Sequence, residues 1–280
     1  MSPLILTAVL FAALLHATWN AMIKISGDRL VIMAVTAFAT SVLAIPFVLL
    51  LPAPAPSSWL FLSVSACIHT LYMLLLVRAY GHGDFVQIYP LARGSAPLLT
   101  ALLGFLLLGE VLSVIEIAGM TLIVASIAGF AGERIGGMRQ LTSSALFYSL
   151  LTGVCITSYS LVDGQGARLA ENPHSYTAWM FLLHGLLFPL IALARRKQLF
   201  FTNARLVWKS GIAVAVISAI AYWIVIWAFS QERIAPVAVL RETSVAFAAL
   251  ISAFLLKEKL SGIRILLILL IIVGIVMLSF

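Results

Sequence analysis

Apolar runs of about 20 residues recur along the whole chain, and they decide what it can fold into. Each run is long enough for a helix to cross a lipid bilayer. Of the 280 residues, 63% are hydrophobic and 10% are charged, whereas soluble domains are about half apolar and about a quarter charged. The sequence therefore predicts an all-α, polytopic membrane protein rather than a soluble one.

Ten membrane-spanning helices are predicted from these runs and from the breaks between them. The proline-rich stretch 51–58 cannot continue a helix. Ser113 and Glu116 have the spacing of a capping box, which predicts a helix start there. The predicted spans are 3–24, 29–51, 57–80, 85–109, 113–131, 142–163, 175–194, 206–230, 235–256 and 261–280.

An internal repeat relates the two parts of the chain. Arg93 lies 17 residues before Glu110, Arg241 lies 17 residues before Glu258, and a serine follows three residues after each glutamate. Apolar helices that matched by chance would align leucines, not an arginine and a glutamate in the same register. The repeat thus indicates that one five-helix unit occurs twice.

The predicted units are residues 1–139 and residues 140–280. Because each holds an odd number of helices, the second must enter the membrane from the opposite side to the first. Inverted repeats of this kind are typical of secondary transporters, whose substrate site lies near the bilayer midplane where the repeats meet.

The net charge of +7 does not predict nucleic-acid binding, because the basic residues form no cluster and lie mostly in short loops. Loop Lys and Arg residues orient membrane proteins, with the basic side in the cytoplasm. One set of alternate loops and helix ends holds thirteen of them, and the other set holds only Arg168 and Arg233. This asymmetry predicts that both termini lie outside the cytoplasm.

Arg93 and Arg241 are the main candidate site residues. A guanidinium at a helix centre costs about 2.5–3.5 kcal/mol, and intramembrane charges usually mark functional sites. Both are expected to face a cavity between the halves, where paired N–H donors suit a carboxylate or phosphonate. Alternatively, each pairs with an internal acid such as Glu242 or Asp163 and only holds helices together. The adjacency of Arg241 and Glu242 argues against that ion pair.

Further polar and aromatic residues at helical spacing extend the candidate site. His16 and Asn20 lie four apart and either line the cavity or bond neighbouring helices. Tyr159 and Asp163 repeat this spacing in the sixth span. The other candidates for shaping the pocket are Trp19, Tyr89, Tyr222 and Trp223.

Several other residues have weaker expected roles. His69 and Tyr72 either line the cavity or pack, and His184 is expected to be a packed histidine. Glu110 and Glu258 are expected to tie helix 4 to helix 5 and helix 9 to helix 10, rather than to carry a coupling proton. Prolines inside helices free backbone carbonyls, which favours the fourth and ninth spans as cavity walls; they are Pro90, Pro97 and Pro236.

Sequence motifs for other chemistry are missing. The chain has no GxxxxGK[ST], HExxH or GxSxG motif and no acidic cluster for catalytic Mg²⁺. No cofactor or metal is therefore predicted, and an enzyme is not expected.

Three stretches resemble the EamA family of the drug/metabolite transporter superfamily: "HATWNAMIK", "RAYGHGDFVQIYPLARGSAPL" and the "LLGE…LS" ending of the fourth span. The resemblance covers the full chain and implies alternating access without ATP. It also implies a cavity walled by helices 1, 3, 4, 6, 8 and 9, with 5 and 10 at the periphery. "HATWN" and "YPLARG" are similar to a permease branch associated with phosphonate utilisation. Better-known members are drawn with both termini inside, from which the loop charges depart.

The resulting hypothesis is a secondary transporter of the bacterial inner membrane for a small anionic or zwitterionic metabolite, such as an organophosphonate or amino acid. Arg93 and Arg241 would hold the acidic group, and Glu242 or Asp163 would meet an amine. The rivals are a proton-coupled exporter of cationic drugs that uses Glu242, an intramembrane enzyme, and a purely structural role. The expected partners are the substrate and the bilayer, and no nucleic acid is expected. A coupling proton is compatible with this hypothesis, and so is either a monomer or a homodimer.

Overall fold

The computed structural model describes residues 1–24, 28–82, 85–135, 142–256 and 261–279, and all regular structure within these ranges is helical. The predicted boundary at 139/140 and the residue Glu258 lie outside the described residues. The elements are α1 (Pro3–Lys24), α2 (Arg29–Leu50), the short 3-10 helix η1 (Pro56–Ser58), α3 (Trp59–His82), α4 (Phe85–Leu108), α5 (Val114–Ile135), α6 (Ser143–Leu169), α7 (Pro173–Arg196), α8 (Gln198–Gln231), α9 (Ile234–Glu242), α10 (Ser244–Leu256) and α11 (Gly262–Ser279).

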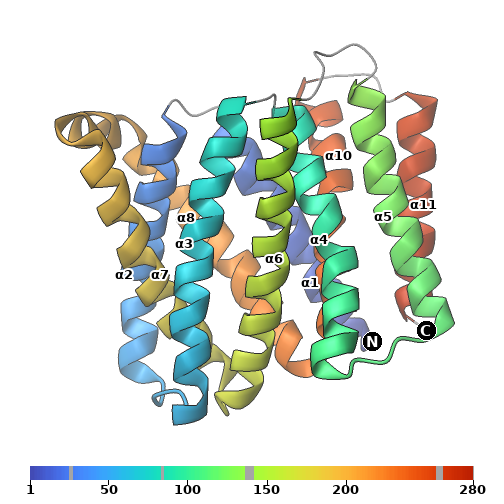
Figure 1. Cartoon of the computed structure of the whole chain (residues 1–280), viewed down its shortest axis with the longest axis horizontal. Helices are drawn as coiled ribbons and strands as arrows, with labels where there is room; N and C mark the ends of the chain where they lie inside the picture. Colours follow the sequence, from blue (N-terminus) through green and yellow to red (C-terminus); the bar gives the residue numbers. More distant parts are fainter. Residues whose placement is uncertain (25–27, 83–84, 136–141, 257–260, 280) are drawn as a thin grey trace.

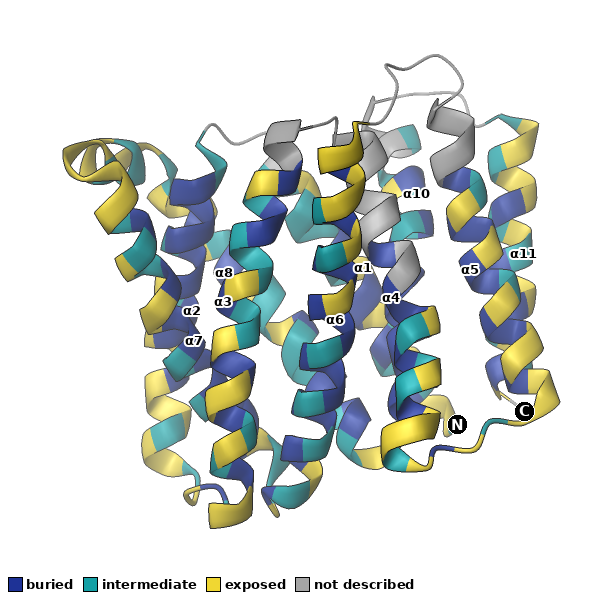
Figure 2. Cartoon of the chain, viewed as in Figure 1, coloured by how far each residue is buried: buried dark blue, intermediate teal, exposed yellow. Residues whose placement is uncertain are grey.

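The helices confirm the predicted fold class, an all-α polytopic membrane protein. Among the residues that the structure describes, eight spans are long and apolar enough to cross a membrane, with α9 and α10 counted together. Large hydrophobic side chains are exposed on the outer faces of the helices (Figure 2), as a lipid-facing surface requires.

Helix ends follow local sequence signals. Asp28 accepts hydrogen bonds from the backbone N–H groups of Leu30 and Val31 at the start of α2. The predicted capping box before α5 is confirmed, because the Ser113 N–H donates to Glu116 Oε2 at 2.8 Å and the Glu116 N–H donates to Ser113 Oγ at 3.2 Å. Side-chain acceptors of this kind satisfy backbone donors that a helix start leaves unpaired.

Three predicted spans differ most from the structure. The sixth ends at Leu169 rather than 163. The eighth begins at Gln198 rather than 206, because Lys197 adopts a φ of 48° and turns the chain directly from α7 into α8. The ninth, predicted as one helix over 235–256, is broken at Thr243 into α9 and α10. The break does not arise at Pro236, which lies in the first turn of α9, where a proline removes no intrahelical hydrogen bond.

Neighbouring helices pair across the two halves of the chain. The pairs α2–α7 and α5–α11 lie at opposite ends of the row in Figure 1, and α3–α6, α4–α6, α1–α8, α1–α10 and α4–α9 pack between them. Both termini lie at the same side of the bundle. The α5–α11 contact is close because Gly119 and Gly274 meet there; a Cβ on Gly119 would lie 2.9 Å from the Gly274 carbonyl oxygen.

Candidate functional site

A buried cluster of two arginines and one glutamate lies where α4 and α9 pack together. Arg93 on α4 and Arg241 on α9 are each 3% exposed, and Glu242 is fully buried. Arg93 binds Glu242 through two hydrogen bonds, Nε to Oε2 at 2.5 Å and Nη2 to Oε1 at 2.8 Å. Arg241 Nε and Nη2 each reach Oε1 at the longer distance of 3.4 Å.

The expectation that adjacency separates Arg241 from Glu242 is wrong. Both lie at the last turn of α9, where the chain leaves regular helical geometry and the Thr243 N–H donates to the Leu240 carbonyl at 3.1 Å. The internal pairing that the sequence left open as an alternative is therefore present. Among the described side chains it is incomplete, because two guanidinium groups share one carboxylate and carry one positive charge more than it neutralises.

Helix α1 contributes His16 to this cluster. The Nε2 atom of His16 contacts Arg93 Nη1, and its Nδ1 atom lies 3.2 Å from the indole nitrogen of Trp19. Asn20 is directed differently, because its side-chain N–H donates to the His16 carbonyl of the same helix at 2.7 Å. Among the predicted residues of α1, His16 therefore touches Arg93, and Trp19 supports its ring edge-on at 4.7 Å.

A second buried cluster surrounds Asp163 on α6. Its Oδ1 atom accepts a hydrogen bond from the hydroxyl of Tyr176 at 3.0 Å, and its Oδ2 atom accepts one from the hydroxyl of Tyr222 at 2.6 Å. The Nε2 atom of His69 lies 2.9 Å from the same Oδ2 atom. These partners come from α7, α8 and α3, so one carboxylate joins four helices.

Tyr159 lies between the two clusters. The guanidinium carbon of Arg241 is 5.7 Å from the centre of the Tyr159 ring, and the ring of His69 stacks on Tyr159 at 4.2 Å. The arginine cluster carries an excess positive charge, and Asp163 carries a negative charge. The structure thus places two poles of opposite sign about one aromatic side chain, between helices of both halves.

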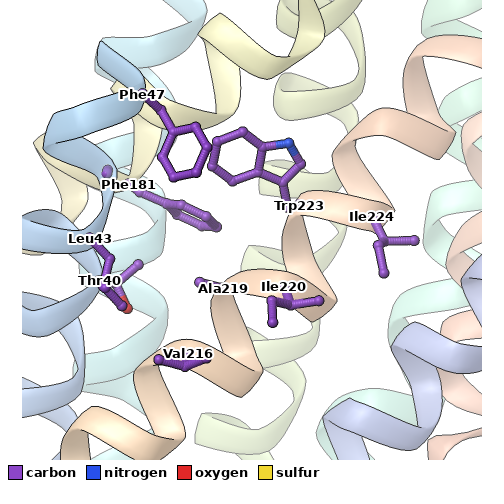
Figure 3. A pocket seen from close by; sticks show the side chains of 10 residues that line it. Thr40, Leu43, Phe47, Phe181, Val216, Ala219, Ile220, Trp223 and Ile224 are labelled. Atoms are coloured by element: carbon purple, nitrogen blue, oxygen red, sulfur yellow. The ribbon is translucent and has the colours of Figure 1, made fainter. Parts of the chain in front are cut away.

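Trp223 does not join this network. Trp223 donates its indole N–H to His174 Nδ1 at 2.8 Å and lines a separate apolar pocket of about 330 Å³ between α2, α7 and α8 (Figure 3). Leu43, Phe47 and Ile220 of this pocket are exposed on the outer surface, so it faces the lipid side. The side chain of Tyr89 lies outside the described residues.

Sequence reasoning missed part of the Asp163 cluster. The sequence left open whether His69 lines the cavity or packs against other helices. Tyr176 was not a candidate, although it is fully buried and its hydroxyl binds Asp163. Four positions from Tyr176 stand Asn172, which caps α7, and Met180, so helical spacing contains no signal for Tyr176. His184 is packed as predicted, with its ring 5.3 Å from that of His69.

The end of α4 and the start of α9 form a second contact between the two halves of the chain. Both carboxylate oxygens of Glu110 accept hydrogen bonds from the Ile234 N–H, at 2.9 and 3.0 Å, and Arg168 Nη2 binds Oε1 at 3.1 Å. Arg168 also donates to the carbonyls of Phe229 and Glu232 at the end of α8. The expectation that Glu110 ties helix 4 to helix 5 is therefore wrong: it caps α9, where a helix N-terminus favours negative charge.

Buried charged groups between membrane-spanning helices usually mark a functional site. Residues 143–280 match the EamA-like transporter family. Among 28 matching chains of known structure, one protein seen in a crystal structure has 18% sequence identity and a TM-score of 0.77, over 98% of this chain and 94% of that chain, which shows a shared fold. No curated protein matches the sequence.

The chain belongs to the EamA-like transporter family. It is thus a multi-pass membrane protein of the drug/metabolite transporter type, and the family indicates a permease rather than an enzyme.

Proposed function

We propose that the chain is a secondary transporter of the bacterial inner membrane that moves a small anionic or zwitterionic metabolite, such as an organophosphonate or amino acid, by alternating access. The observation that carries this proposal is the charge imbalance of the buried cluster, in which Arg93 and Arg241 share Glu242. A positive charge that is not neutralised costs free energy inside a membrane, so such a charge usually marks a functional site.

Arg241 is the proposed primary contact for the acidic group of the substrate. Its hydrogen bonds within the described part of the chain go to Glu242 alone, at 3.4 Å, and are longer than the usual 2.7–2.9 Å of charged pairs. A carboxylate or phosphonate could therefore take shorter hydrogen bonds from this guanidinium. Tyr159, whose ring Arg241 faces, would form one wall of the binding site.

The amine of a zwitterionic substrate has a less direct partner. Both oxygens of Glu242 are held by Arg93, and both oxygens of Asp163 are held by tyrosines. An ammonium group would have to displace one of these donors, so the acidic group of the substrate is proposed to dominate recognition. The same pairing of Glu242 with two arginines disfavours the rival, an exporter of hydrophobic cations.

Thermal unfolding of the detergent-purified protein with a ligand panel tests this function. The panel contains phosphonates, acidic and neutral amino acids, sugar phosphates and hydrophobic cations. A ligand at about tenfold over its Kd stabilises the folded state by about 1.4 kcal/mol. We expect stabilisation by anions or zwitterions that is lost in Arg241→Gln and Arg93→Gln.

The control is Arg205→Gln, which removes one exposed positive charge far from the cluster and should keep the ligand response. Stabilisation by hydrophobic cations alone, kept in Arg241→Gln and lost in Glu242→Gln, would overturn the proposal in favour of the cation exporter.

A further inference from the structure

We propose that the His69–Asp163 pair binds a proton that is transported together with the anion, at a site separate from the arginine cluster. This inference rests on the proposed transport function. It starts from the geometry of the pair, in which His69 Nε2 and Asp163 Oδ2 are 2.9 Å apart and Asp163 is fully buried. His69 belongs to α3 and Asp163 to α6, so the pair joins the two halves of the chain.

Among the groups that contact Asp163, His69 is the basic one, and the others are tyrosine hydroxyl groups. Tyr176 on α7 and Tyr222 on α8 donate hydroxyl groups to the carboxylate, and Tyr159 on α6 stacks on His69. His184 on α7 faces the His69 ring at 5.3 Å. Arg93 on α4 and Arg241 and Glu242 on α9 form the arginine cluster, and Arg241 faces the ring of Tyr159.

This chemistry differs from that of the arginine cluster. Glu242 is neutralised by guanidinium groups, which do not release protons in proteins. Asp163 is instead paired with an imidazole, a side chain that exists in a neutral and a protonated form. The pair is therefore neutral when His69 is protonated and carries one negative charge when it is not. A buried pair that can change its charge by one unit has what a proton-coupling site requires.

Tyr159 brings this charge change close to the anion site. With His69 protonated, Arg93, Arg241, Glu242 and the His69–Asp163 pair sum to one positive charge, and without that proton they sum to zero. An anion near Arg241 is thus held more tightly by the protonated protein. Because binding linkage is reciprocal, anion binding must in turn favour proton binding to the pair. The expected coupling is about tenfold in affinity, within the range of about 5- to 150-fold typical of linked sites.

Isothermal titration calorimetry tests the proposal directly. L-Aspartate and 2-aminoethanesulfonate are used as probes, because their acidic groups keep their charge from pH 5.5 to 7.5. Each is titrated into purified protein in sodium-free solutions of two buffers with different ionisation enthalpies, which reports the protons taken up on binding. We expect proton uptake on binding, and about tenfold tighter binding at pH 5.5 than at pH 7.5.

Variants separate this inference from the proposed function. Asp163→Asn and His69→Gln should still bind a probe but lose proton uptake and the pH dependence of affinity. His184→Gln, which removes a buried histidine without contact to a carboxylate, should keep both. Binding by the unaltered protein without proton uptake, or uptake that persists in both variants, would overturn the inference and leave the transport function intact. Failure of both probes to bind the unaltered protein would count against the proposed function, and the inference would fall with it.

Discussion

At the scale of single residues, the bidentate contact of Arg93 with Glu242 dominates the centre of the molecule. The two residues are 149 positions apart, and each comes from a different half of the chain. Buried ion pairs contribute little relative to apolar packing, but breaking one leaves a buried charge uncompensated. The cluster can therefore recognise an anion and still be necessary for stability.

Glu242→Gln should strongly destabilise the protein, because it leaves both buried arginines without their carboxylate. We expect a loss of about 3–5 kcal/mol in the free energy of unfolding, measured by denaturant unfolding in detergent micelles. Glu171→Gln, at an exposed position, is the matched control and should be close to neutral. Equal stability of the two variants would show that Glu242 is not essential to hold the arginines.

At the scale of elements, α9 is a nine-residue helix attached to the first half at both ends. Glu110 caps its start at Ile234, and Arg93 binds its last residue, Glu242. Since Glu110 lies two residues after the end of α4 and Arg93 lies within it, α4 and α9 are held together at both ends of α9. The break at Thr243 separates this unit from α10.

Glu110→Ala should loosen the contact between the end of α4 and the start of α9. Loss of a helix cap costs about 0.5–2 kcal/mol, and Arg168 loses its carboxylate partner as well. In a chain without Cys67 and Cys155, a cysteine at the buried position Ala235 should then react faster with a membrane-impermeant thiol reagent. Glu232→Ala is the control, because Arg168 binds the backbone carbonyl of Glu232 and not its side chain. An unchanged labelling rate of the cysteine at position 235 in Glu110→Ala would mean that the Glu110 contact does not shield this position from the reagent.

At the scale of the whole molecule, thirteen Lys and Arg residues fall in one set of alternate loops and helix ends, and only Arg168 and Arg233 fall in the set on the side of the termini. The positive-inside rule then predicts that the termini lie outside the cytoplasm. In intact cells, Ser2→Cys should react with an impermeant thiol reagent, whereas Thr142→Cys should react only after the membrane is opened. The reverse pattern would show that the chain is inserted with its termini inside.

The sequence by itself determined the class of protein, nearly all helix positions and the two central arginines. In lipid, backbone polar groups must be satisfied within each helix, so the length of an apolar run is enough to define a span. That Arg93 and Arg241 belong to the central site was also predictable, because a guanidinium inside an apolar run is costly and usually marks a functional site. The break at Thr243 was not, since no proline or glycine stands at that position.

Only the tertiary structure decided how these side chains are paired. Helices that are apolar on most faces carry little periodic signal for their rotation, so the sequence could not show that Tyr222 turns to Asp163 while its neighbour Trp223 turns to His174. Nor could it show that His69 reaches Asp163 across 94 residues, or that Glu110 caps α9. These contacts depend on which helices pack together and at what height, which is set by the whole bundle rather than by local sequence.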